Sequence, residues 1–193
     1  MMNQSDQELV IDLQTGSVEA LGHLYDRYQR MVHRTALAIT GDPEAAADLL
    51  QDVFLRLFRF AGHIDVERPL EPWLYRMTTN LSYTWLKRSR RWLFPLDDLV
   101  DRISSMGRPS IHDEIERNDE WELVQQALLS LPIAQRIVVV LYYLNDLPLQ
   151  EISEILEVPV GTVKSRLHYG RLSLKRKLGL PGEGLLDLNY EGY

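Results

Sequence analysis

Apolar residues recur every three or four positions along most of this chain, and that spacing places them on one side of an α-helix. The first half contains four such segments, over residues 6–15, 17–40, 43–60 and 72–91. Gly41, Asp42 and Pro43 separate the second segment from the third, because glycine ends a helix readily, aspartate caps the next one and proline fits its first position. The first half is therefore predicted to be a helical bundle.

The helical pattern fades over residues 93–116, where two prolines, a glycine and mostly acidic residues occur. This composition is typical of a linker. The pattern returns over residues 117–178, and the tail of residues 179–193, with its four glycines, is expected to be disordered. We predict an all-α protein with two small helical domains, residues 1–92 and 117–178, joined by a flexible acidic linker.

Residues 147–178 carry the pattern of a helix-turn-helix. A short amphipathic helix stops at Val158 and Pro159, and a longer helix follows. Apolar residues share one face of each helix: Ile152, Ile155 and Leu156 in the first, and Val163, Leu167, Leu174 and Leu178 in the second. With these directed inward, a different face of the second helix points outward and carries Gly161, Lys164, Ser165 and His168.

Charge is unevenly distributed along the chain. The formal net charge is −7, yet residues 160–178 hold six Lys or Arg and no carboxylate, and residues 87–91 hold four more basic residues. Neutralising phosphates releases condensed counterions, so concentrated positive charge suits a polyanion. A solvated basic face that offsets the helix dipole is the alternative explanation. Together with the helix-turn-helix pattern, the charge favours DNA binding.

The predicted helix over residues 43–60 has an inward stripe formed by Leu50, Val53, Phe54 and Leu57. The opposite face carries Asp48, Gln51, Asp52, Leu55 and Arg59. An exposed leucine surrounded by carboxylates and an amide indicates a protein-docking surface. The alternative is an ordinary solvated helix face with one stray leucine.

The predicted helix over residues 72–91 mixes three kinds of side chain on one face. Its apolar stripe is Leu74, Met77, Leu81 and Trp85. Toward another face lie Trp73, Arg76, Asn80, Tyr83, Thr84, Lys87 and Arg91. Rings stack on unpaired bases, amides bind base edges and cations hold phosphates, so this face suits single-stranded or partly melted nucleic acid. For Trp73 and Tyr83 taken alone, packing in the apolar core is the alternative.

Several functional classes find no support in the sequence. The chain has no cysteine, and its five histidines fall in no metal-ligand spacing. It has no phosphate-binding glycine loop and no nucleophile elbow, so no enzyme, metal or cofactor is indicated. No window approaches 18 uninterrupted apolar residues and the N-terminus lacks a signal region, so we expect a soluble, cytoplasmic protein without membrane insertion.

Three segments together resemble the bacterial RNA polymerase sigma factors of the extracytoplasmic-function (ECF) group. DLLQDVFLRLFR resembles the polymerase-docking segment of that family, and PWLYRMTTNLSYTWLKRSRR resembles its promoter-melting segment. LPIAQRIVVVLYYLNDLPLQEISEILEVPVGTVKSRL resembles its second DNA-binding domain. The three occur in the family's order and spacing, and the resemblance covers about residues 17–91 and 117–178.

The resemblance implies roles for the first domain. The residues that would dock on the clamp helices of the largest polymerase subunit are Asp48, Leu49, Gln51, Asp52 and Leu55. The loop from Ala61 to Glu71, with Asn80 behind it, would capture a flipped base of the minus-ten promoter element. The DNA backbone would be held by Lys87, Arg88, Arg90 and Arg91.

For the second domain, the resemblance implies that the second helix of the helix-turn-helix enters the major groove of the minus-thirty-five element. The residues facing bases would be Lys164, Ser165, His168 and Tyr169. Those facing phosphates would be Thr162, Arg166, Arg171 and Lys175. The family also implies an anti-sigma factor as a further partner, which masks these surfaces until a signal releases it.

The sequence departs from the family pattern at three positions. Thr84 stands where Asp is usual, and Lys87 stands where Arg is common. Glu157 replaces the usual Gly or Asn at the turn of the helix-turn-helix. If that turn needs a positive φ, glutamate is strained there by about 1 kcal/mol.

The resulting hypothesis is a dissociable initiation subunit that binds core RNA polymerase and promoter DNA. One alternative is a helix-turn-helix regulator that binds duplex DNA as a symmetric dimer, independently of polymerase. That alternative leaves Asp48, Gln51, Asp52 and the aromatic helix unexplained. The other is an interaction module whose helix-turn-helix packs on protein.

Overall fold

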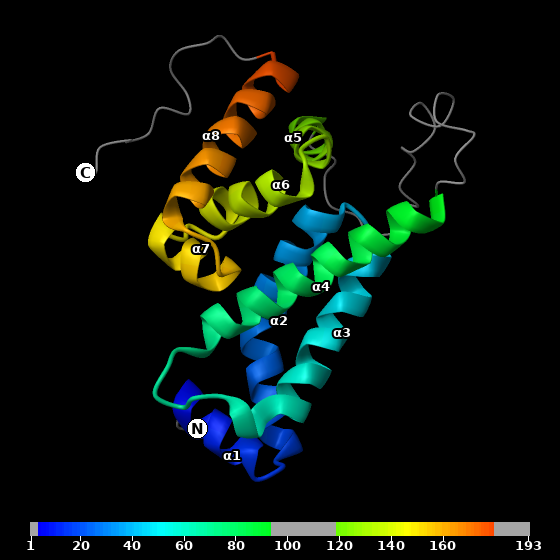
Figure 1. The fold of residues 1–193 in the computed structure, drawn as a ribbon. Helices are drawn as coiled ribbons and strands as arrows, with labels where there is room; N and C mark the ends of the chain where they lie inside the picture. The colour runs from blue at the N-terminus through cyan, green and yellow to red at the C-terminus, as the bar shows by residue number, and fades with distance from the viewer. Residues whose placement is uncertain (1–3, 94–118, 180–193) are drawn as a thin grey trace. The chain divides into compact units, whose positions relative to one another are not determined.

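The structure of this protein is a computed structural model, and it describes residues 4–93 and 119–179. The chain divides into two compact units, residues 1–115 and 116–193. The described residues of both units are helical and include no strand (Figure 1). The all-α prediction with two helical units is thus confirmed. Apart from Leu93 and Gly179, the predicted linker and tail lie outside the described residues.

In the N-terminal unit, three long helices pack on one another and a short helix crosses one end (Figure 1). Its elements are α1 (Asp6–Gln14), α2 (Val18–Thr40), α3 (Pro43–Phe60), the 3₁₀ turn η1 (Ala61–His63) and α4 (Leu70–Leu93). Helices α2, α3 and α4 contact each other pairwise, and α1 contacts α2 and η1. Loop residues 64–69 connect η1 to α4.

Local capping sets these boundaries. Gly41 has a φ of 73° at the end of α2, and the side chain of Asp42 accepts a hydrogen bond from the Ala45 amide at 3.0 Å. Pro43 occupies the first turn of α3, so the predicted boundary between α2 and α3 is confirmed. Ser5 forms a reciprocal capping box with Glu8 at the start of α1.

The apolar core of this unit is close to the predicted one, with two differences. Leu50, Val53, Phe54 and Leu57 of α3 are all buried. The helical spacing of apolar residues places Val18 on the inward side of α2, but it is 69% exposed because it is the first residue of its helix.

Helix α4 is rotated slightly from the predicted stripe. Leu74 is buried, whereas Met77, Leu81 and Trp85 are only partly buried. Small polar residues, namely Thr78, Thr79 and Ser82, occupy the buried side instead. The two threonine hydroxyls donate to the carbonyls of Leu74 and Tyr75 in the same helix. These hydrogen bonds offset the free-energy cost of burying the two hydroxyls.

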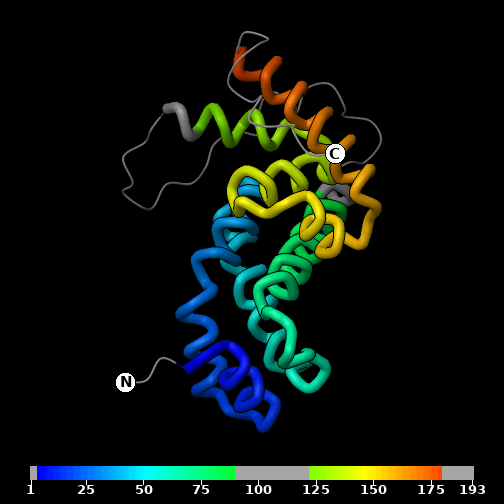
Figure 2. The backbone as a smooth tube through the Cα atoms, turned by 90° about the vertical axis from the view of Figure 1, so that its left-hand side faces the viewer, coloured from blue at the N-terminus to red at the C-terminus, as the bar shows by residue number. Residues whose placement is uncertain are grey.

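The C-terminal unit contains a helix-turn-helix and two preceding helices, and Figure 2 traces its backbone. Its elements are α5 (Asp119–Leu129), α6 (Ile133–Val139), the π-helical turn η2 (Val140–Leu144), α7 (Leu149–Leu156) and α8 (Val160–Lys177). Helix α8 contacts α5, α6 and α7. The apolar core of the C-terminal unit includes Val138, Leu141, Ile152, Val163 and Leu167.

Two residues bring these helices close together. Arg136 of α6 is 3% exposed and donates to the carbonyls of Leu129 and Leu131, so its cation lies at the carbonyl end of α5. Gly170 of α8 is buried against α6, where an added Cβ would lie 2.7 Å from the Val139 Cγ2 atom. Only glycine therefore permits this approach of α8 to α6.

Candidate functional site

Helix α3 presents an exposed face that combines acidic and apolar side chains. Asp48, Gln51 and Asp52 are exposed, and Leu55 is 52% exposed. Their spacing of three and four residues places them on one side of the helix. Phe58, three positions after Leu55, is 37% exposed and extends the same side by another turn. Sequence reasoning missed Phe58, although its spacing from Leu55 was a usable signal.

Leu49 does not belong to this face. Its side chain is 5% exposed and packs with Ala36 of α2 and Ala46 of α3. A side chain in that position stabilises the N-terminal unit and cannot present itself to a partner. The docking role expected for Leu49 is therefore corrected to a role in the apolar core.

Helix α4 exposes polar, aromatic and basic side chains along its second half. Asn80, Tyr83, Thr84, Lys87 and Arg88 are all exposed. The Lys87 ammonium lies 4.7 Å from the Tyr83 ring centroid, so a cation and a ring are presented together. The Thr84 hydroxyl donates to the Asn80 carbonyl at 2.8 Å.

The remaining residues predicted for this face differ in their surroundings. Trp73 is partly buried and packs against the apolar core, so the packing alternative describes it better than a free stacking surface. Arg76 is half-buried. The side chains of Arg90 and Arg91 lie outside the described part of the chain.

The segment between α3 and α4 has two buried residues near its start, and the residues around them are exposed. Ala61 and Ile64 are 3% and 9% exposed, whereas Gly62, His63 and Asp65 are exposed. The Ile64 amide donates to the Ala61 carbonyl at 3.0 Å, closing the η1 turn.

Helix α1 forms hydrogen bonds with the two buried residues of this loop. The Gln14 side-chain amide, at the end of α1, donates to the carbonyl oxygens of Ala61 at 3.1 Å and Ile64 at 3.0 Å. Sequence reasoning missed Gln14, because a hydrogen bond to backbone 47 and 50 residues away leaves no periodic signal in the sequence.

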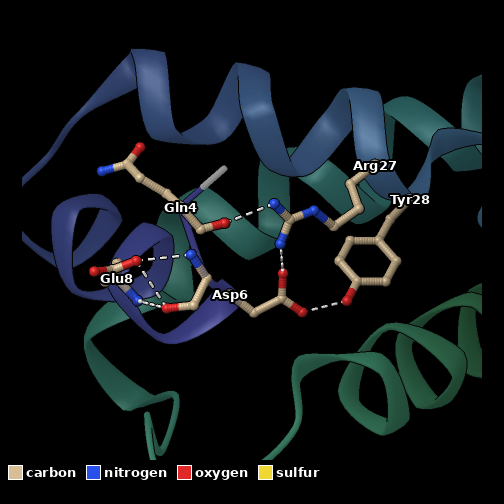
Figure 3. Close-up of polar contacts among 6 residues, drawn as sticks. Gln4, Asp6, Glu8, Arg27 and Tyr28 are labelled. Atoms are coloured by element: carbon tan, nitrogen blue, oxygen red, sulfur yellow. Dashed lines mark hydrogen bonds and ion pairs between the residues drawn. The ribbon is translucent and has the colours of Figure 1, made fainter. Parts of the chain in front are cut away.

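A polar cluster fastens the other end of α1 to α2 (Figure 3). The Asp6 carboxylate pairs with the Arg27 guanidinium and accepts a hydrogen bond from the Tyr28 hydroxyl. Arg27 also donates to the Gln4 carbonyl at 2.8 Å. Burial, then the hydrogen bond to Asp6, raises the pKa of Tyr28 well above its usual range, so the phenol remains a donor.

The turn between α7 and α8 has the geometry expected of a helix-turn-helix. Glu157 has φ 52° and ψ 44°, so the turn does need a positive φ and the condition for strain at this glutamate is met. The Val158 amide donates to the Ser153 carbonyl at 3.2 Å, and the Ser153 hydroxyl donates to the Val158 carbonyl at 2.6 Å. These bonds hold the turn residue Val158 against the end of α7 despite the strained residue.

The outward face of α8 matches the predicted one. Gly161, Ser165, His168 and Tyr169 are exposed, and Lys164 is half-buried. The rings of His168 and Tyr169 are 5.4 Å apart in an edge-on arrangement. The Ser165 hydroxyl donates to the Thr162 carbonyl at 3.0 Å.

The residues predicted to face phosphates flank this surface. All four are half-buried: Thr162, Arg166, Arg171 and Lys175. The aliphatic stems of Arg166, Arg171 and Lys175 can lie against the helix while their charged ends reach solvent. The first turn of α8 carries no acidic residue, and its last turn holds Lys175, Arg176 and Lys177.

Neither a metal site nor a membrane span is found in the part of the chain that the structure describes. Over residues 4–93 and 119–179, no cluster of three or more His, Asp or Glu could hold a metal ion. Among the same residues, no helix combines the length and the apolar character needed to cross a membrane.

Comparison with protein families identifies two matching regions. Residues 24–92 match the family described as sigma-70 region 2, and residues 121–174 match sigma-70, region 4. The first match covers most of α2, all of α3 and most of α4. The second covers most of the C-terminal unit.

Individual relatives match over most of their length. The chain is 31% identical to the ECF RNA polymerase sigma factor SigW of Bacillus subtilis, over 92% of this chain and 98% of that protein. It is also 31% identical to the ECF RNA polymerase sigma factor SigM of Mycobacterium tuberculosis, over 94% of this chain and 89% of that protein.

Two solved structures share the fold. One is CnrH in complex with the cytosolic domain of CnrY, with a TM-score of 0.67 and 21% identity, over 91% of this chain and 98% of that one. The other is the sigma factor RpoE in complex with the anti-sigma factor NepR from Bartonella quintana, with a TM-score of 0.68 and 18% identity, over 84% and 99%.

Proposed function

The chain belongs to the ECF group of RNA polymerase sigma factors and directs promoter-specific transcription with that polymerase, and on this premise we propose which surfaces perform each step. Sigma factors are DNA-binding initiation factors. We propose that this one has no chemistry of its own and acts in the cytoplasm, where polymerase and promoter DNA occur.

The outer face of α3 is the proposed contact with the clamp helices of the largest polymerase subunit. Its members are Asp48, Gln51, Asp52, Leu55 and Phe58. An exposed apolar pair next to carboxylates supports this role, because apolar anchors contribute binding energy while charges orient the partner. This face carries the proposal most directly, since a regulator that works without polymerase has no need of it.

The loop of residues 61–71 and the exposed face of α4 are the proposed site of minus-ten recognition. Asn80, Tyr83 and Thr84 face solvent where a base can reach them. Lys87 and Arg88 are exposed further along α4 and would hold the backbone, and Arg90 and Arg91 remain predicted to continue this strip. A flipped, unstacked base fits such a site and a paired base does not, so binding favours the melted promoter.

Helix α8 is the proposed reader of the minus-thirty-five element in the major groove. Lys164, Ser165, His168 and Tyr169 form its outward face and are assigned to bases. The flanking residues Thr162, Arg166, Arg171 and Lys175 are assigned to phosphates, which set orientation without reading sequence.

An anti-sigma factor is the proposed regulatory partner. The RpoE structure that shares this fold contains the anti-sigma factor NepR. Binding of such a protein to the α3 face or to α8 would block polymerase or DNA. The chain would then be released when the inhibitor is removed.

The decisive experiment reconstitutes holoenzyme from the full chain and core polymerase, and selects bound sequences from random duplex DNA. We expect two preferred blocks separated by a spacer, with unpaired thymines in the downstream block detected by permanganate. The chain without polymerase should select neither block. Selection of a palindrome by the free chain would instead support the independent regulator.

A further inference from the structure

We infer that Gln14, at the C-terminal end of α1, is a positioning residue for promoter opening that acts through the loop of residues 61–71. This inference rests on the proposed function, in which that loop captures a base of the minus-ten element. Gln14 lies before the region that matches sigma-70 region 2, which begins at residue 24.

The hydrogen bonds of Gln14 join the two ends of the first turn of the loop. Its Nε2 atom donates to the carbonyl oxygens of Ala61 at 3.1 Å and Ile64 at 3.0 Å. The Ala61 carbonyl also accepts the Ile64 amide at 3.0 Å. One side chain thus bridges the same two residues that the backbone hydrogen bond closes, so opening the turn breaks the backbone bond and at least one bond of Gln14.

Helix α1, which carries Gln14, is itself held in place by packing and by contacts at both ends. The inner side of α1 buries Leu9, Val10 and Leu13 in the apolar core. Immediately after Gln14 the chain turns at Gly16, with φ 92°, and the Ser17 amide donates to the Asp12 carbonyl at 3.1 Å. At its other end, α1 is fastened to α2 by the Asp6, Arg27 and Tyr28 cluster (Figure 3).

The loop is therefore held by α1 at its buried residues, while its outer residues face solvent. Ala61 and Ile64 are buried, whereas Gly62, His63 and Asp65 face solvent. A loop that is already ordered loses less conformational entropy when it binds a base than a loop that must first be ordered. The gain appears only when a base is captured, and this separates a positioning role from a purely structural one.

The test uses holoenzyme made with the full chain and a promoter selected as described above. Single abasic sites are placed in turn at each non-template position of the minus-ten element, and promoter affinity is measured for each. The variants are Gln14→Ala, Gln14→Glu, which has nearly the same shape but cannot donate, and the control Gln7→Ala. Gln7 is an exposed glutamine on the same helix.

We expect Gln14→Ala and Gln14→Glu to weaken binding of the intact promoter by about three- to tenfold, the size of about one net hydrogen bond. Gln7→Ala should bind as the wild type does. One abasic position should weaken the wild type strongly, and at that position the Gln14 variants should show no further loss.

Two results would overturn the inference and leave the proposed function standing. The first is wild-type affinity in both Gln14 variants when an abasic position does weaken the wild type. The second is an equal loss on intact and abasic promoters, which would indicate a general effect on the fold. If no abasic position weakens the wild type, the proposed base capture by the loop fails instead.

Discussion

Helices α3 and α8 have the same length and comparable packing, yet their outward faces differ in chemistry. Each has 18 residues, with one side buried in its own unit. The outward side of α3 carries Asp48 and Asp52 beside the exposed apolar residues Leu55 and Phe58. The helix α8 contains six Lys or Arg and no carboxylate.

The difference shows how helices of the same length and similar packing can suit two kinds of partner. Apolar side chains among carboxylates suit a protein surface, because a polyanion would be repelled by the acids. A cluster of cations suits the phosphates of DNA. The fold fixes where each helix lies within its unit, and the outward residues decide what it binds.

The largest effect is expected from Leu55→Asp, which places a further carboxylate at the apolar centre of the α3 face. The affinity for core polymerase should fall by about a hundredfold or more, as expected when an interface anchor is lost. Binding of labelled chain to core polymerase measures this. Because Leu55 is 52% exposed, the circular dichroism spectrum and melting temperature should stay near those of the wild type.

Val18→Asp is the matched control, since Val18 is 69% exposed on the same unit but lies outside the α3 face. It should retain polymerase affinity. Unchanged affinity in Leu55→Asp, or an equal loss in both variants, would remove the assignment of α3 as the docking helix.

The next effect concerns the packing that holds α8 in place. Gly170→Ala puts a methyl group 2.7 Å from the Val139 Cγ2 atom. We expect the free energy of unfolding of the C-terminal unit to fall by about 1–3 kcal/mol, measured by urea unfolding of the full chain. Gly161→Ala, in the same helix with no atom within 4 Å of its Cβ, should be neutral or slightly stabilising. Equal stability of the two variants would contradict this role of Gly170.

Much of this fold could be predicted where one residue type imposes one local geometry. Asp42 and Pro43 set the start of α3, and Gly41 sets the end of α2. The inward stripe of α3 followed from its spacing, because the large apolar residues Leu50, Val53, Phe54 and Leu57 recur at helical intervals and are all buried. The sequence raised a positive φ at Glu157 only as a condition, and the structure supplies it.

The rest depended on contacts between distant parts of the chain. Thr78 and Ser82 look polar in the sequence, but they are buried because small side chains let α4 approach its neighbours. Leu49 was given a docking role only by the resemblance to the family, and its contacts with Ala36 and Ala46 place it inside. Gln14 is invisible to periodicity because its partners are backbone carbonyls of a loop.

On α8, Lys164→Ala tests whether the cationic face reads bases or only holds phosphates. We expect a loss of about 1–2 kcal/mol in holoenzyme binding to a promoter with the intact upstream element, and a much smaller loss when that element is scrambled. Arg176→Ala removes one charge from the exposed end of the same helix and should weaken both promoters alike. If Lys164→Ala also weakens both promoters equally, Lys164 contacts phosphate and not a base.

The smallest effect is expected at the turn that joins α7 to α8. Glu157 has φ 52°, a conformation that glycine adopts without strain, so Glu157→Gly should raise the free energy of unfolding by about 0.5–1 kcal/mol. Glu154→Gly, one turn earlier within α7, should lower it by a similar amount, because glycine weakens a helix interior. Urea unfolding of both variants gives the comparison. Opposite signs would show that the turn geometry of the helix-turn-helix is retained despite its glutamate, and destabilisation by both would mean that the Glu157 side chain contributes more than its backbone strain costs.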